Sequence, residues 1–439
     1  MKYKYNIYAI FLSLFFSIIC GCKDEVDVNG DFEVEIFENT QLKEALTKKG
    51  YSFDENGQLI CNKMVLDTKE LDLSNCNLVS LEGLNLFTAL ESLNVDDNEF
   101  FETFNFEHLP KSLKSISLKG NDNITYYKSL MDETNSKVVR NKLELLRLPA
   151  SAKWNTNEIP AFARNAAEVT KVELFDESGN FSEYTFLREI PDAKLQSLLK
   201  NLYPSVFDKA SGKINLNFVM TESADLVINE EIENLEGVEY IIGRNDFKGN
   251  VSLKGVSNKK YGMDYVALSS GVKSLNIVNI NTPNGIYLSN ASSLKSVRVE
   301  NNDEVPYLKL SGSFLSGKME DINTLKNGLT VINCKVLSGI VISNETTGVT
   351  GKIILKDLPS LQELDLSVLN GIHTFVAKGL SNGIEKLKLP LEINTVSDGY
   401  GNNKGVSNIC LSVENESQFQ SFIDLCRLAA KVYDVSFFY

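Results

Sequence analysis

The stretch that decides the fold is LESLNVDDNEF at residues 90–100, because its spacing of apolar residues recurs on both sides of it in the chain. LDLSNCNL precedes it at 71–78, and LKSISLKGNDNI follows it at 113–124. When Leu71, Leu93 and Ile116 are aligned, the copies lie 22 and 23 residues apart. A recurring period of this length predicts an array of similar structural units.

Within each copy, apolar residues two positions apart predict a short strand whose core side chains point to one side. Three positions after the second of them comes a residue at which the chain should turn inward, namely Cys76, Asn98 or Asn121. An amide side chain there can satisfy backbone groups that stacked turns would otherwise bury unpaired. Asn98 and Asn121 are therefore predicted to have structural roles.

The same pattern returns later in the chain, as Val297-x-Val299, Leu364-x-Leu366 and Leu387-x-Leu389. Leu364 precedes Leu387 by 23 residues, which again matches the period. We therefore expect repeats over 66–148 and again over 234–412, joined in one continuous, mainly parallel sheet.

The period is poorest over 149–233. Asp192–Tyr203 has the pattern of an amphipathic helix that ends before Pro204, and Ile214-x-Leu216 is the next strand candidate. Irregular repeats or a helical insertion would explain the segment, with a small separate α+β domain as the alternative. The lone tryptophan, Trp154, lies here and is read as a packing residue or, alternatively, as a partly exposed contact residue.

Both ends of such an array need covering, because a terminal unit exposes its apolar face and strand edges. Residues 32–65 are expected to form an N-terminal cap with a helix over 40–49. Residues 413–439 are expected to form a C-terminal cap, in which a capping box at Ser417 begins a helix and 434–439 forms a last strand. Within the first cap, Asp54–Ile60 is read as a turn, because the carboxylates of a calcium loop are incomplete.

The first 21 residues have the order of a secretory signal: Lys2 and Lys4, then an uncharged apolar run at 7–19, then small residues. The apolar run is shorter than the roughly twenty residues that a spanning helix needs. Ile19-Cys20-Gly21-Cys22 resembles a bacterial lipobox, which implies cleavage before Cys22 and lipid attachment to it. An ordinary cleaved signal is the alternative.

Residues 22–31 are expected to form a flexible acidic tether. Lys23, Asp24 and Glu25 resemble the charged tract that follows the lipidated cysteine in surface-exposed lipoproteins of the Bacteroidota, and a solvated tether without a sorting role is the alternative. The implied location is the outer membrane, with the chain facing the cell surface or, alternatively, the periplasm.

Charge and motif content exclude several functions. The formal net charge is −14, and loss of Lys2 and Lys4 with the signal makes it −16, so nucleic acid is not an expected partner. The only histidines, His108 and His373, lie far apart, and there is no Cys-x-x-Cys or glycine-rich phosphate loop. We therefore expect no catalytic centre, no metal and no cofactor.

The cysteines after Cys22 are odd in number and sparse, which does not suggest a disulfide framework.

Residues that flank the core positions of the strands should form a continuous concave face, the usual binding surface of repeat arrays. The candidate ligand contacts on it are Asp72, Asn94, Asp96, Ser117, Arg298, Asp365 and Lys388. A polar face of mixed charge suits a protein partner.

These repeats resemble the leucine-rich repeats of internalin-like and BspA-like surface lipoproteins of the Bacteroidota, most specifically over 40–124 and less so over 270–411. The resemblance implies an α/β-type solenoid, an irregular leucine-rich-repeat array with helical caps, which binds an extracellular or host protein. A glycan-capture lipoprotein of a polysaccharide-uptake system is the alternative function.

Replacing Cys22 tests the lipid anchor. In cells fed a labelled fatty acid, Cys22→Ala should abolish incorporation of the label into the protein, whereas Cys20→Ala should retain it. Label that persists in Cys22→Ala would disprove attachment at this residue.

Overall fold

A computed structural model describes the chain from residue 39 onward. Within that range it leaves out the residues at 101, 127, 133, 141–142, 167, 177, 230–231, 233, 256–260, 263–267, 269–270, 284, 289–292, 312–315, 318–327, 344–348, 369–371, 382, 390–395, 398–402, 405–407, 413–416, 422–423, 425–433 and 439. The expected signal, the tether and Cys22, Lys23, Asp24 and Glu25 therefore lie outside the described residues. Among the described residues, no helix is long and apolar enough to cross a membrane.

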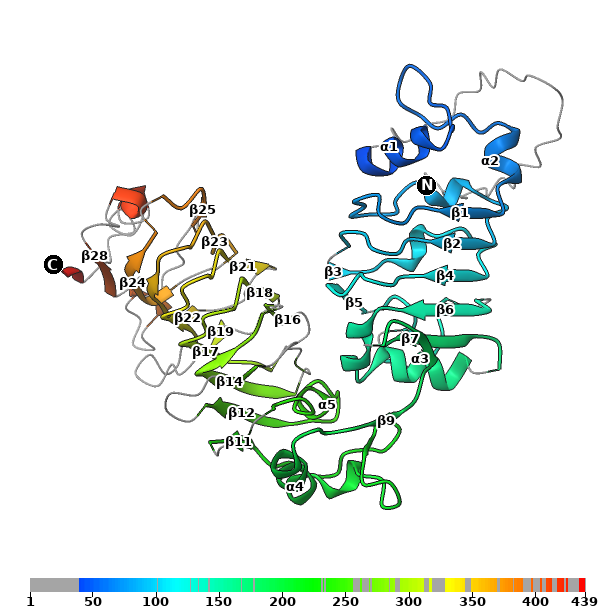
Figure 1. The fold of residues 1–439 in the computed structure, drawn as a ribbon. Coiled ribbons are helices and arrows are strands. Elements are labelled where there is room, and N and C mark those ends of the chain that lie inside the picture. The colour runs from blue at the N-terminus through cyan, green and yellow to red at the C-terminus, as the bar shows by residue number, and fades with distance from the viewer. Residues whose placement is uncertain are drawn as a thin grey trace, which may run out of the picture.

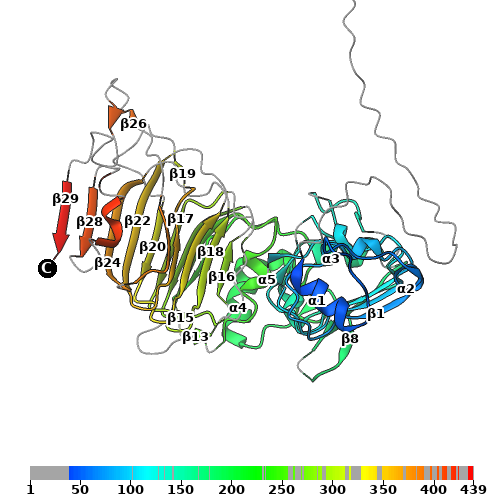
Figure 2. The ribbon, with the colours of Figure 1, turned by 90° about the horizontal axis from the view of Figure 1, so that it is seen from above.

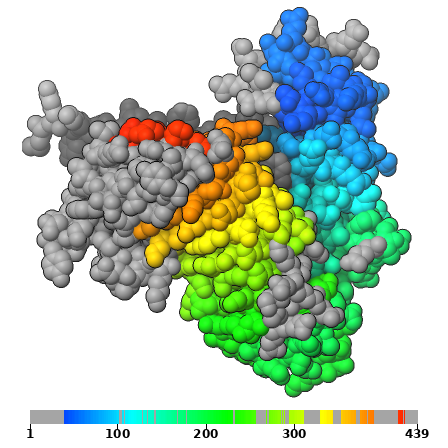
Figure 3. All heavy atoms as spheres, turned by 60° about the vertical axis from the view of Figure 1, so that its left-hand side comes forward, coloured from blue at the N-terminus to red at the C-terminus, as the bar shows by residue number. Residues whose placement is uncertain are grey.

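The protein is an α/β protein with mostly parallel sheets and few helices. Figure 1 shows two stacks of strands joined at the base by a green segment around α4 and β9. Figure 2, seen from above, shows the strands of the C-terminal stack side by side in a row. In the space-filling view of Figure 3, the green surface is continuous with both the cyan and the yellow-green surfaces.

In the described part of the N-terminal stack, a six-stranded sheet is parallel except for its last strand. Leu71 pairs with Leu93, and Leu93 pairs with Ile116, which confirms the alignment predicted from the period. The strands, in order, are β1 (Glu70–Asp72), β2 (Ser92–Asn94), β4 (Ser115–Ser117), β6 (Leu145–Leu148), β7 (Lys171–Phe175) and β8 (Phe181–Glu183).

The other sides of these turns are made of short elements instead of a second long sheet. Their apolar side chains and those of the strands form one buried cluster that extends from Leu42 to Val172. The elements are the helices α1 (Thr40–Lys48), α2 (Lys63–Asp67) and α3 (Glu158–Ala166), the 3-10 turns η1 (Leu84–Leu86), η2 (Phe106–His108) and η3 (Ala150–Trp154), and the paired strands β3 (Glu102–Thr103) and β5 (Ile124–Thr125). Before β1, the Asp54 carboxylate accepts the backbone N–H groups of Asn56 and Gln58, so the predicted turn is confirmed.

The segment between the stacks contains the predicted helix, α4 (Ala193–Leu202), which Asp192 caps by accepting the N–H groups of Lys194 and Leu195. Ile214 lies in a strand, but that strand is antiparallel to its partner and outside the large parallel sheets. Leu195 and Leu199 pack into the apolar cluster of the C-terminal stack. The remaining elements are β9 (Leu187–Arg188), η4 (Pro204–Val206), β10 (Ile214–Asn215) and α5 (Glu239–Ile242).

Trp154 joins the first stack to this segment. Its ring is buried and stacks on Tyr240 with 5.1 Å between ring centroids, which confirms the packing role. Nearby, the Asn157 amide donates to the carbonyl of Gly243 at 2.6 Å, and the Arg188 Nε donates to the carbonyl of Lys153 at 3.1 Å. Residues far apart in sequence are thus linked by packing and hydrogen bonds.

In the described part of the C-terminal stack, the chain alternates between a ten-stranded and a five-stranded sheet. The first contains β11 (Leu226–Ile228), β12 (Gly249–Lys254), β14 (Val272–Val278), β17 (Ser296–Glu300), β20 (Gly328–Ile332), β22 (Val349–Leu358), β24 (Ile372–Leu380), β28 (Asn408–Ser412) and β29 (Asp434–Phe438), with β19 (Ser316–Gly317) antiparallel to β22. The second contains β16 (Ile286–Leu288), β18 (Tyr307–Ser311), β21 (Gly339–Ser343), β23 (Glu363–Asp365) and β25 (Lys386–Lys388). Two further pairs are β13 (Tyr261–Gly262) with β15 (Ile280–Asn281) and β26 (Val396–Ser397) with β27 (Asn403–Lys404).

The expectation of one continuous sheet was wrong. Val297 lies in the ten-stranded sheet, whereas Leu364 and Leu387 pair with each other in the five-stranded sheet. The physical reason is that the turns from β14 to β25 contribute one strand to each sheet, and both strands carry the apolar-x-apolar pattern that faces the shared core. Periodicity alone could not tell which of the two sheets a copy belongs to.

Both stacks make the same corner after the strand. In several turns of each stack, the backbone adopts the left-handed conformation four positions after the first core residue of the strand, and Asn, Asp and Gly tolerate this conformation best. At Gly120 (φ 75°) an added Cβ would lie 2.1 Å from an oxygen of the Asp97 carboxylate, which would have to move, so glycine suits this corner. The corner residues are Asn75, Asp97 and Gly120 in the first stack, and Asn279, Asn301, Asn333, Asp357 and Gly379 in the second.

Next to the corner, the predicted structural asparagines are confirmed. The Asn121 amide donates to the carbonyls of Val95 and Leu118, both at 3.0 Å, and its Oδ1 accepts the N–H of Asn98 at 3.1 Å. Asn98 in turn accepts the N–H groups of Cys76 and Leu78 and donates to the carbonyl of Leu73. Each amide therefore ties its own turn to a neighbouring one.

At the C-terminal end, β29 confirms the predicted last strand and pairs in parallel with β28. Most of the expected helix after Ser417 lies outside the described residues. Phe419 is buried against Phe375, with 5.4 Å between ring centroids, so this segment contacts the core.

Replacing Asn121 tests the corner. Asn121→Ala removes the amide that donates to the Val95 and Leu118 carbonyls and accepts the N–H of Asn98, so we expect the free energy of unfolding to fall by about 2–4 kcal/mol in urea denaturation. Asn123→Ala, at an exposed site two residues away, should change it by less than about 0.5 kcal/mol. Equal effects of the two variants would refute the role of the amide.

Candidate binding surface

The outward side chains of the six-stranded sheet form one face, which we call the sheet face. The strand register aligns Asp72, Asn94, Ser117, Arg147 and Glu173 in a row across β1, β2, β4, β6 and β7. Core residues such as Leu71 and Leu93 alternate with them and point inward. Of the seven contacts predicted from sequence, the structure brings Asp72, Asn94, Asp96 and Ser117 together on this face.

At the first end of the sheet face, carboxylates are held by neighbouring hydroxyl and amide groups. Asp96 Oδ1 accepts the Ser117 hydroxyl at 2.6 Å and the backbone N–H of Lys119 at 2.8 Å. Asp72 accepts the backbone N–H and the hydroxyl of Ser74, and these bonds lower the pKa of its carboxyl. The lowered pKa keeps the Asp72 carboxylate ionised at neutral pH, and the hydrogen bonds hold both carboxylates in place.

The other end combines charge with aromatic rings. Glu173 is buried between two cations, with Arg147 Nε at 2.8 Å and Lys171 Nζ at 2.6 Å. The hydrogen bond from Arg147, followed by that from Lys171, lowers the pKa of Glu173. Beside them, the half-buried Phe175 and Phe181 pack edge to face with centroids 5.3 Å apart.

Cations flank this aromatic pair: Arg147 lies over Phe181 at 4.9 Å and Lys119 over Phe175 at 5.8 Å. We call Lys119, Arg147, Glu173, Phe175 and Phe181 the aromatic end of the sheet face. The sequence did not predict the aromatic end, because Val172 follows Leu146 by 26 residues instead of the usual 22 or 23. In addition, β8 runs antiparallel to β7 and does not continue the repeat. The sequence feature that could have indicated the aromatic end is the pair of phenylalanines on either side of the Asp176–Asn180 turn.

The other three predicted contacts lie elsewhere. Arg298 is on the ten-stranded sheet, where it pairs with Glu300. Asp365 and Lys388 lie on the five-stranded sheet, 3.0 Å apart. Burial alone would raise the pKa of the Asp365 carboxyl, but the hydrogen bonds from Ser367 and then from Lys388 lower it. The hydrogen bond to Asp365 in turn raises the pKa of Lys388. The structure thus distributes the seven residues over three sheets.

A row of alternating charge, also missed from sequence, runs along one edge of the first stack. Lys69, Glu91, Lys114 and Glu144 each stand one residue before a strand, and Glu91 lies 2.7 Å from Lys114 and 3.8 Å from Lys69. Part of the signal was present in the sequence, because Lys69, Glu91 and Lys114 are spaced by 22 and 23 residues, whereas Glu144 follows Lys114 by 30. We call these four residues the charged row.

The described residues offer few groups for other chemistry. They contain no cluster of three or more His, Cys, Asp or Glu side chains that could hold a metal ion. His108 lies near Asn105, with 3.4 Å between Nε2 and the amide nitrogen. Among the described cysteines, Cys61, Cys76 and Cys334 form no disulfide, and only Cys334 of these three is buried. The absence of an enzyme activity remains a prediction.

No protein-family model matches the chain, and no curated protein matches it significantly.

The buried Glu173 gives a pH dependence with a defined sign. Its folded-state pKa is depressed, so its stabilisation is present above the ordinary glutamate pKa and is lost as pH falls through the folded value. Glu173→Gln should lower the free energy of unfolding at pH 7 by about 1–2 kcal/mol and weaken its loss between pH 6 and pH 3.

Glu183→Gln is the matched control, because Glu183 is exposed and stands opposite Glu173 in the register. Urea unfolding across this pH range should leave its profile parallel to that of the parent protein. A Glu173→Gln profile that also parallels the parent would contradict the assignment.

Proposed function

We propose that the protein is a lipid-anchored surface protein that binds a protein partner through the sheet face. In this proposal, the stacked turns are an irregular leucine-rich-repeat solenoid, and α1 covers its first turn as a cap. The observed parallel register at 22 and 23 residues and the shared corner support the repeat assignment. The anchor at Cys22, the outer membrane location and the sorting role of Lys23, Asp24 and Glu25 rest on the sequence alone.

The observation that carries the proposal is the aromatic end of the sheet face. Binding energy in protein interfaces concentrates in aromatic and arginine side chains, surrounded by polar groups. Here Phe175, Phe181 and Arg147 lie together, and hydrogen bonds already hold the neighbouring charges. Ordered side chains lose less conformational entropy on binding, so such a face is prepared for a partner.

The main alternative is a glycan-capture lipoprotein. The same Phe175–Phe181 pair favours it, because sugars stack on aromatic rings. The two rings, however, pack edge to face with an interplanar angle of 63°, so they present no shared flat platform. A mixed-charge face with a small aromatic patch is better matched to a protein.

A binding screen tests the function. The soluble form, residues 23–439, is applied to arrays of extracellular proteins and of glycans, and we expect a protein hit. Arg147→Glu should weaken it at least tenfold, whereas Arg298→Glu, a matched change on another sheet, should not. Signals from glycans alone would replace the proposal with the alternative.

A further inference from the structure

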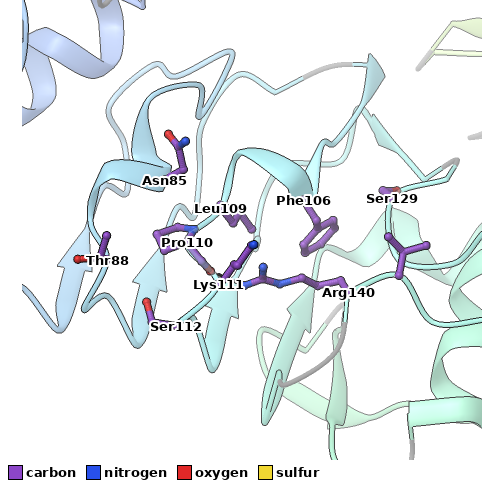
Figure 4. A pocket seen from close by; sticks show the side chains of 10 residues that line it. Asn85, Thr88, Phe106, Leu109, Pro110, Lys111, Ser112, Ser129 and Arg140 are labelled. Carbon is purple, nitrogen blue, oxygen red and sulfur yellow. Dashed lines mark hydrogen bonds between the residues drawn. The ribbon is translucent and has the colours of Figure 1, made fainter. Parts of the chain in front are cut away.

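The edge that bears the charged row also contains a pocket (Figure 4), formed by segments that lead into β2, β4 and β6. It encloses about 470 Å³, a size typical of ligand pockets in proteins. A second hollow of about 620 Å³ adjoins it, since Lys111 and Ser112 line both. The second hollow is bordered by all four residues of the charged row. We call the two together the edge groove.

The wall of the pocket is apolar. Phe106, Leu109 and Pro110 are buried and line it, and Val139 leaves 49% of its surface exposed. In the adjoining hollow, Val169 is 60% exposed. Among the residues that line the pocket, Val139 is the exposed apolar side chain that a partner can contact.

Two cations, Lys111 and Arg140, belong to the same pocket, and their charged ends point toward one another in Figure 4. Arg140 donates to the carbonyl of Pro110 at 2.6 Å, while its buried Nε has no hydrogen-bond partner. Burial lowers the pKa of Arg140. Among the described side chains no carboxylate pairs with either cation, and none lines this pocket.

The nearby acids are engaged with other groups: Glu91 and Glu144 border the adjoining hollow beside Lys114, and Glu158 accepts the N–H and the hydroxyl of Ser129 behind the pocket. Glu91 lies 2.7 Å from Lys114, and the hydrogen bond to Glu91, with the charge of Glu144, raises the pKa of Lys114. In a chain with net charge −14, two adjacent cations without an acid are a local reversal of charge. An anionic group of a ligand would complement them.

We propose that the edge groove binds an extended peptide segment of a partner protein. A carboxylate of the segment pairs with Lys111 and Arg140, and an adjacent apolar side chain contacts Val139. The charged row spans four neighbouring strands, about 15 Å at a strand spacing of about 4.8 Å, which matches four to five residues of extended chain. A groove that continues across turns favours a chain over a compact molecule.

This site deepens the proposed function, because the partner is again a protein, but it uses a surface separate from the sheet face. Random heptapeptides displayed on phage are selected on the soluble form, and enriched sequences are remeasured as synthetic peptides by fluorescence polarisation. We expect an Asp or Glu next to a large apolar residue. Affinity should fall at least tenfold in Lys111→Glu and in Val139→Asp, both at exposed sites where folding should persist.

Lys209→Glu, an equal charge reversal at an exposed site away from the groove, should leave affinity unchanged. No enriched motif, a motif without an acid, or binding insensitive to Lys111→Glu would overturn the site. Displacement of the peptides by equimolar phenylacetate would also overturn it, in favour of a small-molecule pocket.

The two proposals can fail separately. A protein hit on the array that is lost in Arg147→Glu, together with no selected peptide, would leave the sheet face and remove the groove. Acidic peptides that require Lys111, without any protein hit dependent on Arg147, would do the reverse.

Discussion

The structure depends on satisfying backbone polar groups at the inner corner of each turn. Stacked turns remove carbonyl and N–H groups from water, and each unpaired one would cost about 1–3 kcal/mol. Asn98 and Asn121 meet this constraint by bonding to their own turn and to the turn before. Further along, Asn302, which is also buried, accepts the N–H groups of Thr282 and Val305. The strands, and thereby the surfaces they carry, are positioned by these corners.

The two stacks share this corner and differ on their other side. In the first, 3-10 turns and short helices close each coil, so one sheet presents one broad face. In the second, a second parallel sheet closes the coil, and the chain shows two faces. For this reason Arg298 and the Asp365–Lys388 pair, which look equivalent in the sequence, cannot contact a common ligand surface on one sheet.

The sequence predicted the structure correctly wherever a residue pattern is compatible with only one structural environment. Leu71, Leu93 and Ile116 gave the correct register, and Asp192 correctly marked the start of α4. It was insufficient where one pattern fits two environments, as at Val297 and Leu364, since both face the same core. The aromatic end and the edge groove depend on contacts between turns of unequal length, such as those of Arg147 with Phe181 and of Arg140 with Pro110. Spacing within a single repeat does not encode such contacts.

The charged row has a consequence for how the chain reaches this arrangement. Similar repeats can stack in the wrong order during folding, because their apolar strands are nearly interchangeable. With Lys69, Glu91, Lys114 and Glu144 alternating in sign, a turn that skips its neighbour would bring like charges together at the edge. The alternating charges therefore favour the correct order of the turns. They disfavour a misfolded arrangement with a skipped turn, even where the apolar core could accommodate it.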